Sequence, residues 1–147
     1  MKIINTLQLV LIASILSLVS CNSQKTIPMK EYHKGEYSEL TEKEFTVIED
    51  EGQLKTVYNR IMGQKDIPNI NWNQQQVVLL TLGQKYTGGY GIDISEVIKT
   101  NKEIKVLYKI KNPKAGDIVT QALTAPYVMT SIDNPKKLPV VFEEITE

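Results

Sequence analysis

The chain has few of the side chains on which nucleophilic and metal chemistry depend. Its 147 residues include one cysteine and one histidine, Cys21 and His33. A single cysteine has no partner for an internal disulfide bond. A lone histidine far from any candidate serine does not supply a catalytic triad, and no group of histidines and thiols forms a zinc-type ligand set. We therefore predict no catalytic residues, no metal site and no cofactor.

The chain also has no excess of charge of either sign. It contains 17 basic and 17 acidic residues, which gives a formal net charge of zero. Nucleic-acid binding requires a concentrated basic face, because the phosphate backbone dominates the affinity. The balanced charge therefore argues against a nucleic-acid partner, and it also argues against electrostatic attachment to a membrane.

The N-terminal segment has the pattern of a bacterial lipoprotein signal. Lys2 is followed by an apolar run of about 13 residues from Leu7 to Val19, and then by Leu18-Val19-Ser20-Cys21. That tetrapeptide resembles a lipobox, in which the cysteine accepts the lipid. The alternative is an uncleaved membrane helix, but the run is shorter than the roughly 20 residues that span a bilayer. We predict that residues 1–20 are a signal peptide and that acylated Cys21 anchors the protein in the cell envelope, outside the cytoplasm.

The residues after Cys21 divide into a polar segment and a patterned domain. Residues 22–40 are rich in lysine and glutamate and show little hydrophobic periodicity. We therefore predict a flexible tether over residues 21–40 and one domain over residues 41–147, since the length suits one domain and not comfortably two.

One segment predicts a helix, over about residues 51–62. Asp50 is a good N-cap, and Gln53 stands three residues later, as in a capping box. Apolar residues then follow at helical spacing and form one stripe: Leu54, Val57, Tyr58 and Ile61. We expect this stripe to pack on a sheet.

The rest of the domain is patterned as short strands. The continuous apolar run from Val77 to Leu82 is typical of a strand buried on both faces. Alternation or β-rich composition predicts further strands near residues 45–48, 90–94, 104–110, 118–132 and 140–142. Pro126 interrupts the 118–132 stretch, which indicates an edge, a bulge or a crossing between sheets. The predicted fold is mainly β: an antiparallel Ig-like sandwich or barrel with one packed helix.

The glycine-rich segment Gly88-Gly89-Tyr90-Gly91 has two interpretations. Phosphate binding is not one of them, because the following residues alternate like a strand instead of opening a helix. The glycines can form a hairpin turn that requires positive φ. Alternatively, the exposed loop Tyr86-Thr87-Gly88-Gly89-Tyr90 offers two aromatic side chains to a partner.

Two further features of the sequence have weaker functional readings. Asp93 and Glu143 can form a carboxylate pair for glycoside hydrolysis if they meet in space, although nothing else in the sequence points to such a site. Trp72 stands at the entrance to a buried strand, where a tryptophan is more often a core anchor than a ligand platform.

Two stretches resemble the C-terminal domain of the PrcB family, bacterial lipoproteins described as protease-complex subunits. The first runs from Ile67-Pro68-Asn69-Ile70-Asn71-Trp72 through the apolar strand to Thr87-Gly88-Gly89-Tyr90. The second runs from Pro113 to Tyr127 and contains Val119-Thr120-Gln121-Ala122 and Pro126-Tyr127, with Ala115 as a small departure from a Pro-Gly turn. Together they cover about residues 65–130.

This resemblance implies a non-catalytic, lipid-anchored accessory subunit that binds and supports a secreted or envelope protease. We expect the following residues to contact the protein partner: Tyr86, Thr87, Gly88, Gly89, Tyr90, Pro126 and Tyr127. A looser similarity is to chagasin-type inhibitors, Ig-like sandwiches that push three loops into a papain-like cleft. Thr87-Gly88-Gly89-Tyr90 is similar to their Thr-Thr-Gly-Tyr loop and Ala125-Pro126-Tyr127 to their Arg-Pro-Trp loop, but their Asn-Pro, arginine and tryptophan are absent. Protease inhibition and an envelope lipoprotein that binds another ligand therefore stay as alternatives.

Overall fold

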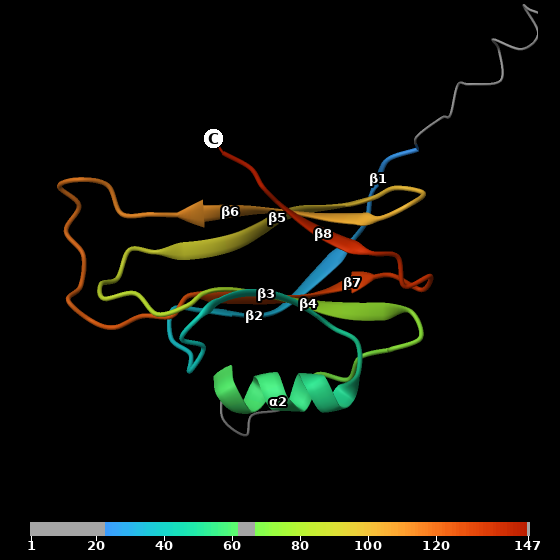
Figure 1. Ribbon diagram of the computed structural model, residues 1–147, viewed down its shortest axis with the longest axis horizontal. Helices are drawn as coiled ribbons and strands as arrows, with labels where there is room; N and C mark the ends of the chain where they lie inside the picture. The colour runs from blue at the N-terminus through green and yellow to red at the C-terminus, as the bar shows by residue number, and fades with distance from the viewer. Residues whose placement is uncertain (1–22, 62–66, 147) are drawn as a thin grey trace, which may run out of the picture.

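Two four-stranded β-sheets and one helix make up the computed structural model, which describes residues 23–61 and 67–146. The predicted signal peptide and Cys21 lie outside the described residues. The two sheets pack face to face, and the helix covers the outer face of one of them (Figure 1). The sheets do not close into a barrel, so the predicted sandwich with one packed helix is confirmed. No helix in the described part of the chain has the length and apolar character needed to cross a membrane.

The first sheet, sheet A, has the strand order β1-β5-β6-β8. Its strands are β1 (Lys25–Thr26), β5 (Gly91–Lys99), β6 (Ile104–Lys111) and β8 (Val140–Glu144). The β1–β5 and β5–β6 pairs are antiparallel, whereas β6 and β8 are parallel. The predicted antiparallel sandwich thus includes one parallel pair, at β8. The parallel pair arises because β7 of the other sheet lies between these two strands in the sequence and reverses the chain direction once more.

The second sheet, sheet B, has the order β2-β7-β4-β3, and every pair is antiparallel. Its strands are β2 (Met29–Gly35), β7 (Tyr127–Asp133), β4 (Gln75–Leu82) and β3 (Lys43–Ile48). Central strand β4 is buried on both faces, as its continuous apolar run predicts. Val78 and Leu80 lie in the core between the sheets, and Val77 and Leu79 lie in a second core beneath the helix.

Helix α2 (Glu51–Ile61) has the predicted capping box and the predicted apolar stripe. The Asp50 carboxylate accepts a hydrogen bond from the Gln53 backbone N–H at 2.9 Å, and the Gln53 side-chain oxygen accepts one from the Glu49 N–H at 3.1 Å. Leu54 and Tyr58 are the buried residues of the helix, and they pack on sheet B. The helix therefore forms a third layer, on the outer face of sheet B.

The prediction of a flexible tether over residues 21–40 is wrong for residues 25–35. These residues contribute β1 at one edge of sheet A and β2 at one edge of sheet B. Strand β2 carries the charged residues Lys30, Glu31 and Lys34, and charged side chains on an edge strand hinder pairing with other chains. Strand β2 is stabilised by backbone pairing with β7. Such pairing leaves no trace in the hydropathy pattern of the strand.

Two predicted boundaries around the loops are also wrong. The β-type stretch 118–132, which Pro126 is expected to interrupt, is a strand only from Tyr127 onward, and residues 112–126 form a long connection. The segment Gly88-Gly89 is not a hairpin turn, because β4 and β5 lie in different sheets. Both differences place more loop at one end of the sandwich than the sequence predicts.

Candidate functional site

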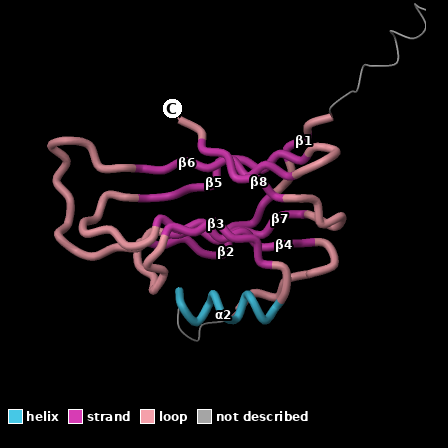
Figure 2. The backbone as a smooth tube through the Cα atoms, in the orientation of Figure 1, coloured by secondary structure: helices cyan, strands magenta, loops and turns pink. Residues whose placement is uncertain are grey.

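Three long connections gather at one end of the sandwich. They are the β2–β3 loop (residues 36–42), the β4–β5 loop (residues 83–90) and the β6–β7 loop (residues 112–126). Figure 2 shows them together at the left of the sandwich. We call this region the three-loop end. Strand β1 pairs with the opposite end of β5, at Ile98 and Lys99, and so lies far from it.

Backbone hydrogen bonds join the β4–β5 loop to the β6–β7 loop. Lys85 and Thr124 form a two-way bridge, with N–O distances of 2.7 and 2.9 Å. The Gly88 N–H donates to the Thr120 carbonyl at 2.9 Å, and the Thr124 hydroxyl donates to the Thr87 carbonyl at 2.9 Å. The two segments that carry the PrcB-like motifs therefore contact each other.

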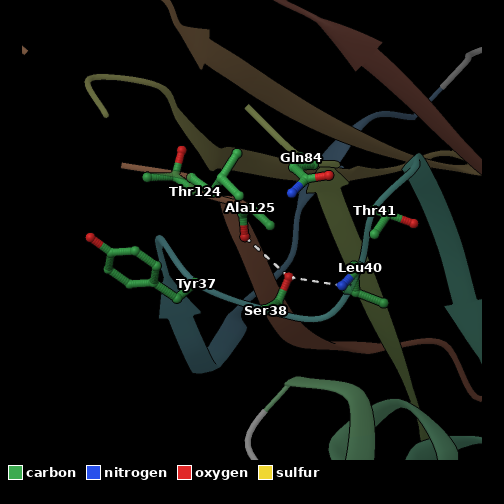
Figure 3. A pocket seen from close by; sticks show the side chains of 8 residues that line it. Tyr37, Ser38, Leu40, Thr41, Gln84, Thr124 and Ala125 are labelled. Carbon is green, nitrogen blue, oxygen red and sulfur yellow. Dashed lines mark hydrogen bonds between the residues drawn. The ribbon is translucent and has the colours of Figure 1, made fainter. Parts of the chain in front are cut away.

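The β2–β3 loop is tied to both other loops in the same way. The Ala125 N–H donates to the Glu36 carbonyl at 2.7 Å, and the Gln84 N–H donates to the Thr41 carbonyl at 2.9 Å. The Ser38 hydroxyl donates to the Ala125 carbonyl at 3.1 Å and accepts from the Leu40 N–H at 3.3 Å (Figure 3). These bonds fix the relative positions of the loops before any partner binds, which lowers the entropic cost of binding.

The two adjacent glycines are required by this packing and not by a hairpin. Gly89 has a φ of +87°, a conformation that side chains rarely adopt. A Cβ at Gly88 would collide with the Thr120 hydroxyl, and one at Gly89 would come within 2.9 Å of Val119. The glycines thus allow the β4–β5 loop to lie directly against the β6–β7 loop.

Large apolar side chains point outward at this end. Six of them are exposed in the described part of the chain, and four belong to the three loops: Tyr37 (61% exposed), Tyr86 (85%), Ile118 (103%) and Leu123 (54%). Large side chains exposed together on preorganised loops are typical of a protein-docking surface.

Of the predicted contact residues in the β4–β5 loop, Tyr86 is the most exposed. Thr87 and Tyr90 are half-buried, and Gly88 is buried against the neighbouring loop. Tyr90 packs against the core between the sheets, and the Lys85 ammonium lies 5.6 Å from the centre of its ring. Tyr86 therefore is the aromatic side chain of this loop that can reach a partner most fully.

Tyr127 does not belong to this surface, contrary to the prediction, and Pro126 reaches it only as part of the lining of a hollow. Both are buried, and Tyr127 is only 4% exposed. The Pro126 carbonyl accepts from the Leu82 N–H at 3.0 Å, and Tyr127 lies in the core beneath α2, where burial raises its pKa. Alternation along β7 turns Tyr127 toward the helix, and the sequence alone does not indicate that a helix covers this face.

Two hollows flank the bridge between Glu36 and Ala125. The smaller has a volume of about 70 Å³, and its lining includes Tyr37, Gln84 and Leu123. The larger, of about 470 Å³, is lined by strand residues of both sheets and by loop residues that include Glu36 and Tyr90. The larger hollow is bordered by the ion pair of Lys34 with Asp93, so its charged groups are partly satisfied within the chain.

The carboxylate pair of Asp93 and Glu143, considered above as an alternative, does not form. Glu143 lies on β8 and binds the Lys105 ammonium at 3.0 Å, and this contact raises the pKa of Lys105. Asp93 lies on β5, pairs with Lys34, and is separated from β8 by the intervening strand β6. Among residues 23–61 and 67–146, no group of three or more histidine, cysteine or acidic side chains that could hold a metal ion is found.

Sequence reasoning missed three of the four outward side chains. Tyr37 fell in the predicted tether, and Ile118 and Leu123 fell in a predicted strand. The β6–β7 loop contains two features that favour a loop, Pro113 and the turn around Gly116, whereas the β-rich composition after residue 118 favours a strand.

Residues 76–133 match the family described as PrcB C-terminal. This range runs from β4 to the end of β7 and contains the whole of the β4–β5 and β6–β7 loops. The predicted PrcB resemblance is therefore confirmed over these residues. Comparison with curated proteins found no match, and neither did comparison with solved structures.

Proposed function

Since residues 76–133 carry the PrcB C-terminal match, we propose that this protein is a non-catalytic accessory lipoprotein that docks on a secreted or envelope protease. The family supports a protease-complex role in general, and the three-loop end supplies the surface. The acylated Cys21 would hold the protein in the bacterial cell envelope. The partner is a protein, and docking requires no cofactor and no chemistry by the chain itself.

The observation that carries the proposal is the collection of four exposed apolar side chains on loops that hydrogen bonds already hold in place. Tyrosine and leucine side chains bury large areas at interfaces, and fixed loops lose little entropy on binding. A few such anchors can supply most of the binding energy of a complex.

The position of the N-terminal strand is consistent with lipid anchoring. Lys25 begins β1 at the end of the sandwich opposite the loops (Figure 1). A lipid at Cys21 would therefore hold the chain by one end and leave the three-loop end facing away from the bilayer. A partner would then reach the exposed side chains without obstruction by lipid.

The test is affinity purification of the acylated protein from native membranes, followed by identification of what is captured with it. We expect a protease in stoichiometric amount, and at least tenfold less of it with Tyr86→Ser or Ile118→Ser, because truncating an interface anchor costs about 2 kcal/mol. Met29→Ser is the matched control, since Met29 is 40% exposed but lies in β2 outside the loops. Equal capture by all three variants would contradict the assignment of the surface.

The anchor has its own test. Cys21→Ser should release the protein from membranes into the soluble fraction, because stable attachment at this site depends on buried acyl chains. Continued sedimentation of Cys21→Ser with membranes would remove the anchor from the proposal and leave the docking surface standing.

One observation favours a second function, inhibition of the protease. Three loops at one end of a sandwich are the arrangement that chagasin-type inhibitors use, and the β4–β5 loop carries Thr87 to Tyr90 there. An activity assay of the captured protease separates the two functions. An accessory subunit leaves proteolysis unchanged or increased, whereas an inhibitor lowers it in proportion to occupancy and loses that effect with Tyr86→Ser.

A further inference from the structure

The smaller hollow at the three-loop end has a lining without charge. It lies between the β2–β3 loop and the ends of the other two loops, and Figure 3 shows Tyr37 on one side and Gln84 and Thr41 on the other. All eight lining residues are uncharged, although 23% of the chain is charged. Apolar side chains of Tyr37, Leu40, Leu123 and Ala125 contribute to its walls.

The walls of this hollow are fixed in position. The Ser38 hydroxyl bonds to the Ala125 carbonyl at 3.1 Å, and the Gln84 N–H bonds to the Thr41 carbonyl at 2.9 Å. Because these polar groups already have hydrogen-bond partners, they do not require a polar ligand in the hollow. The volume of about 70 Å³ holds several waters, since one water needs ~10–15 Å³ by the same measure. It therefore has room for one small aliphatic side chain.

The rim on one side is acidic. The β2–β3 loop carries Glu36, Glu39 and Glu42, all exposed, and it contains no lysine or arginine. The lysine of the neighbouring loop, Lys85, holds its ammonium over the Tyr90 ring. The loop that forms one wall of the hollow therefore carries three exposed acidic residues and no basic one, and we call it the acidic rim.

From this lining and rim we infer that the hollow between Tyr37 and Leu123 binds a leucine- or valine-sized side chain of the protein partner, within a segment that carries basic residues beside it. The inference rests on the proposed docking function and specifies the chemistry that the partner presents. Opposite charge around an apolar anchor gives specificity and faster association, and the acidic rim disfavours an anionic lipid surface as the occupant.

The probe is a set of acetylated, amidated peptides of sequence Gly-Lys-X-Lys-Gly, in which X is glycine, leucine or tryptophan. They are titrated into the full-length chain in detergent micelles, with leucine and alanine methyl groups labelled for NMR. We expect the leucine peptide to shift the methyl signals of Leu123 and Ala125 and to leave that of Leu107 on β6 unchanged. The glycine and tryptophan peptides should bind at least tenfold more weakly.

Two variants and one peptide isolate the two parts of the inference. Leu123→Ser removes a wall and should weaken the leucine peptide about tenfold, whereas Glu39→Gln with Glu42→Gln should weaken it severalfold and reduce its salt dependence. The peptide Gly-Asp-Leu-Asp-Gly should bind more weakly than its lysine counterpart. Val141→Ser, at an exposed apolar residue on β8, is the control and should bind normally.

Equal affinity of the three Gly-Lys-X-Lys-Gly peptides would overturn the inference about the hollow. Chemical-shift changes confined to methyl groups other than those of Leu123 and Ala125 would overturn it as well. Binding of phosphatidylglycerol vesicles through Leu123 in place of peptides would overturn it as well. Either result leaves the docking proposal intact if Tyr86→Ser still loses the protease. Loss of both the peptide effect and the Tyr86 dependence would instead remove the docking surface itself.

Discussion

The two ends of the sandwich differ in how their side chains are used. At the three-loop end, backbone groups of one loop bond to backbone groups of another, and several side chains are left free to point outward. At the opposite end, side chains close the turns. Asn134 is fully buried and its amide bonds to Gln76 and to the backbone of Leu138, at distances from 2.5 to 2.9 Å.

The β5–β6 turn at that opposite end is closed in the same manner. The Thr100 hydroxyl donates to the Glu103 carbonyl at 3.0 Å and accepts from the N–H groups of Lys102 and Glu103. Polar side chains that are used in this way are not available to a partner. The comparison indicates that one end of the molecule contributes mainly to stability and the other mainly to contact, and substitutions at each end test this division.

The largest expected effect on stability is at the Asn134 end. Asn134→Ala should lower the free energy of unfolding by about 2–4 kcal/mol, because Gln76 and Leu138 are left with buried groups that have no partner. Urea denaturation measures the change. Asn112→Ala, the same substitution at an exposed site in the β6–β7 loop, should cost less than about 0.5 kcal/mol. A similar cost at both sites would remove the contrast between the ends.

The next effect tests the packing between loops. Gly88→Ala should destabilise the fold by about 1–3 kcal/mol and reduce protease capture, because the new Cβ collides with Thr120. Thr120→Ala should restore much of the loss in the double variant, which a double-mutant cycle measures. At Gly91 the nearest atom to an added Cβ, on Lys111, is 3.6 Å away, so Gly91→Ala is the neutral control.

Alkaline titration tests whether the two ends unfold together. Burial, and next the neighbouring Tyr127 and Tyr32, raise the pKa of Tyr58 to about 12. The unfolded chain ionises near pH 10, so the stability from neutral Tyr58 is complete below pH 10 and is lost as the pH rises toward 12.

The expected loss over this pH range is roughly 1–3 kcal/mol. Tyr58→Phe should flatten the curve of unfolding free energy against pH, with the remaining slope due partly to buried Tyr127. Protease capture should decline only as the whole domain unfolds. Loss of capture before any change in global stability would show that the three-loop end opens independently.

The smallest expected effect on stability is at Tyr86. Because its side chain is 85% exposed, Tyr86→Ser should change the midpoint of thermal unfolding by an amount equivalent to less than about 0.5 kcal/mol. The same variant should lose most of the captured protease. A strongly destabilised Tyr86→Ser protein would mean that this residue supports the fold and does not serve only for contact.

Local patterns predicted the elements that depend on local interactions. The capping box at Asp50 and Gln53 located the start of the helix, and the apolar run around Val78 and Leu80 identified a strand covered on both faces. The partners of the helix cap lie within a few residues in the sequence. Strand β4 is buried on both faces, so its apolar composition alone identifies it.

The remaining differences arise from contacts between residues distant in sequence. Strand β2 exists because β7 pairs with it, almost 100 residues later in the chain, so its own charged residues do not reveal it. Tyr127 is covered by a helix whose position the sequence does not give. The candidate site was therefore predicted at Tyr86 but missed at Tyr37 and Leu123, which become neighbours only through the fold.

The early start of strand β1 limits how far an anchored molecule could move. Only three residues separate Cys21 from Lys25, so a lipid on Cys21 would sit within about 14 Å of the folded body. Strand β5 has nine residues and spans roughly 30 Å, from that body's base to the start of its loops. An anchored copy would thus hold its three-loop end at a nearly constant distance from the membrane. A membrane-bound protease would have to present its binding segment at the same distance from the lipid.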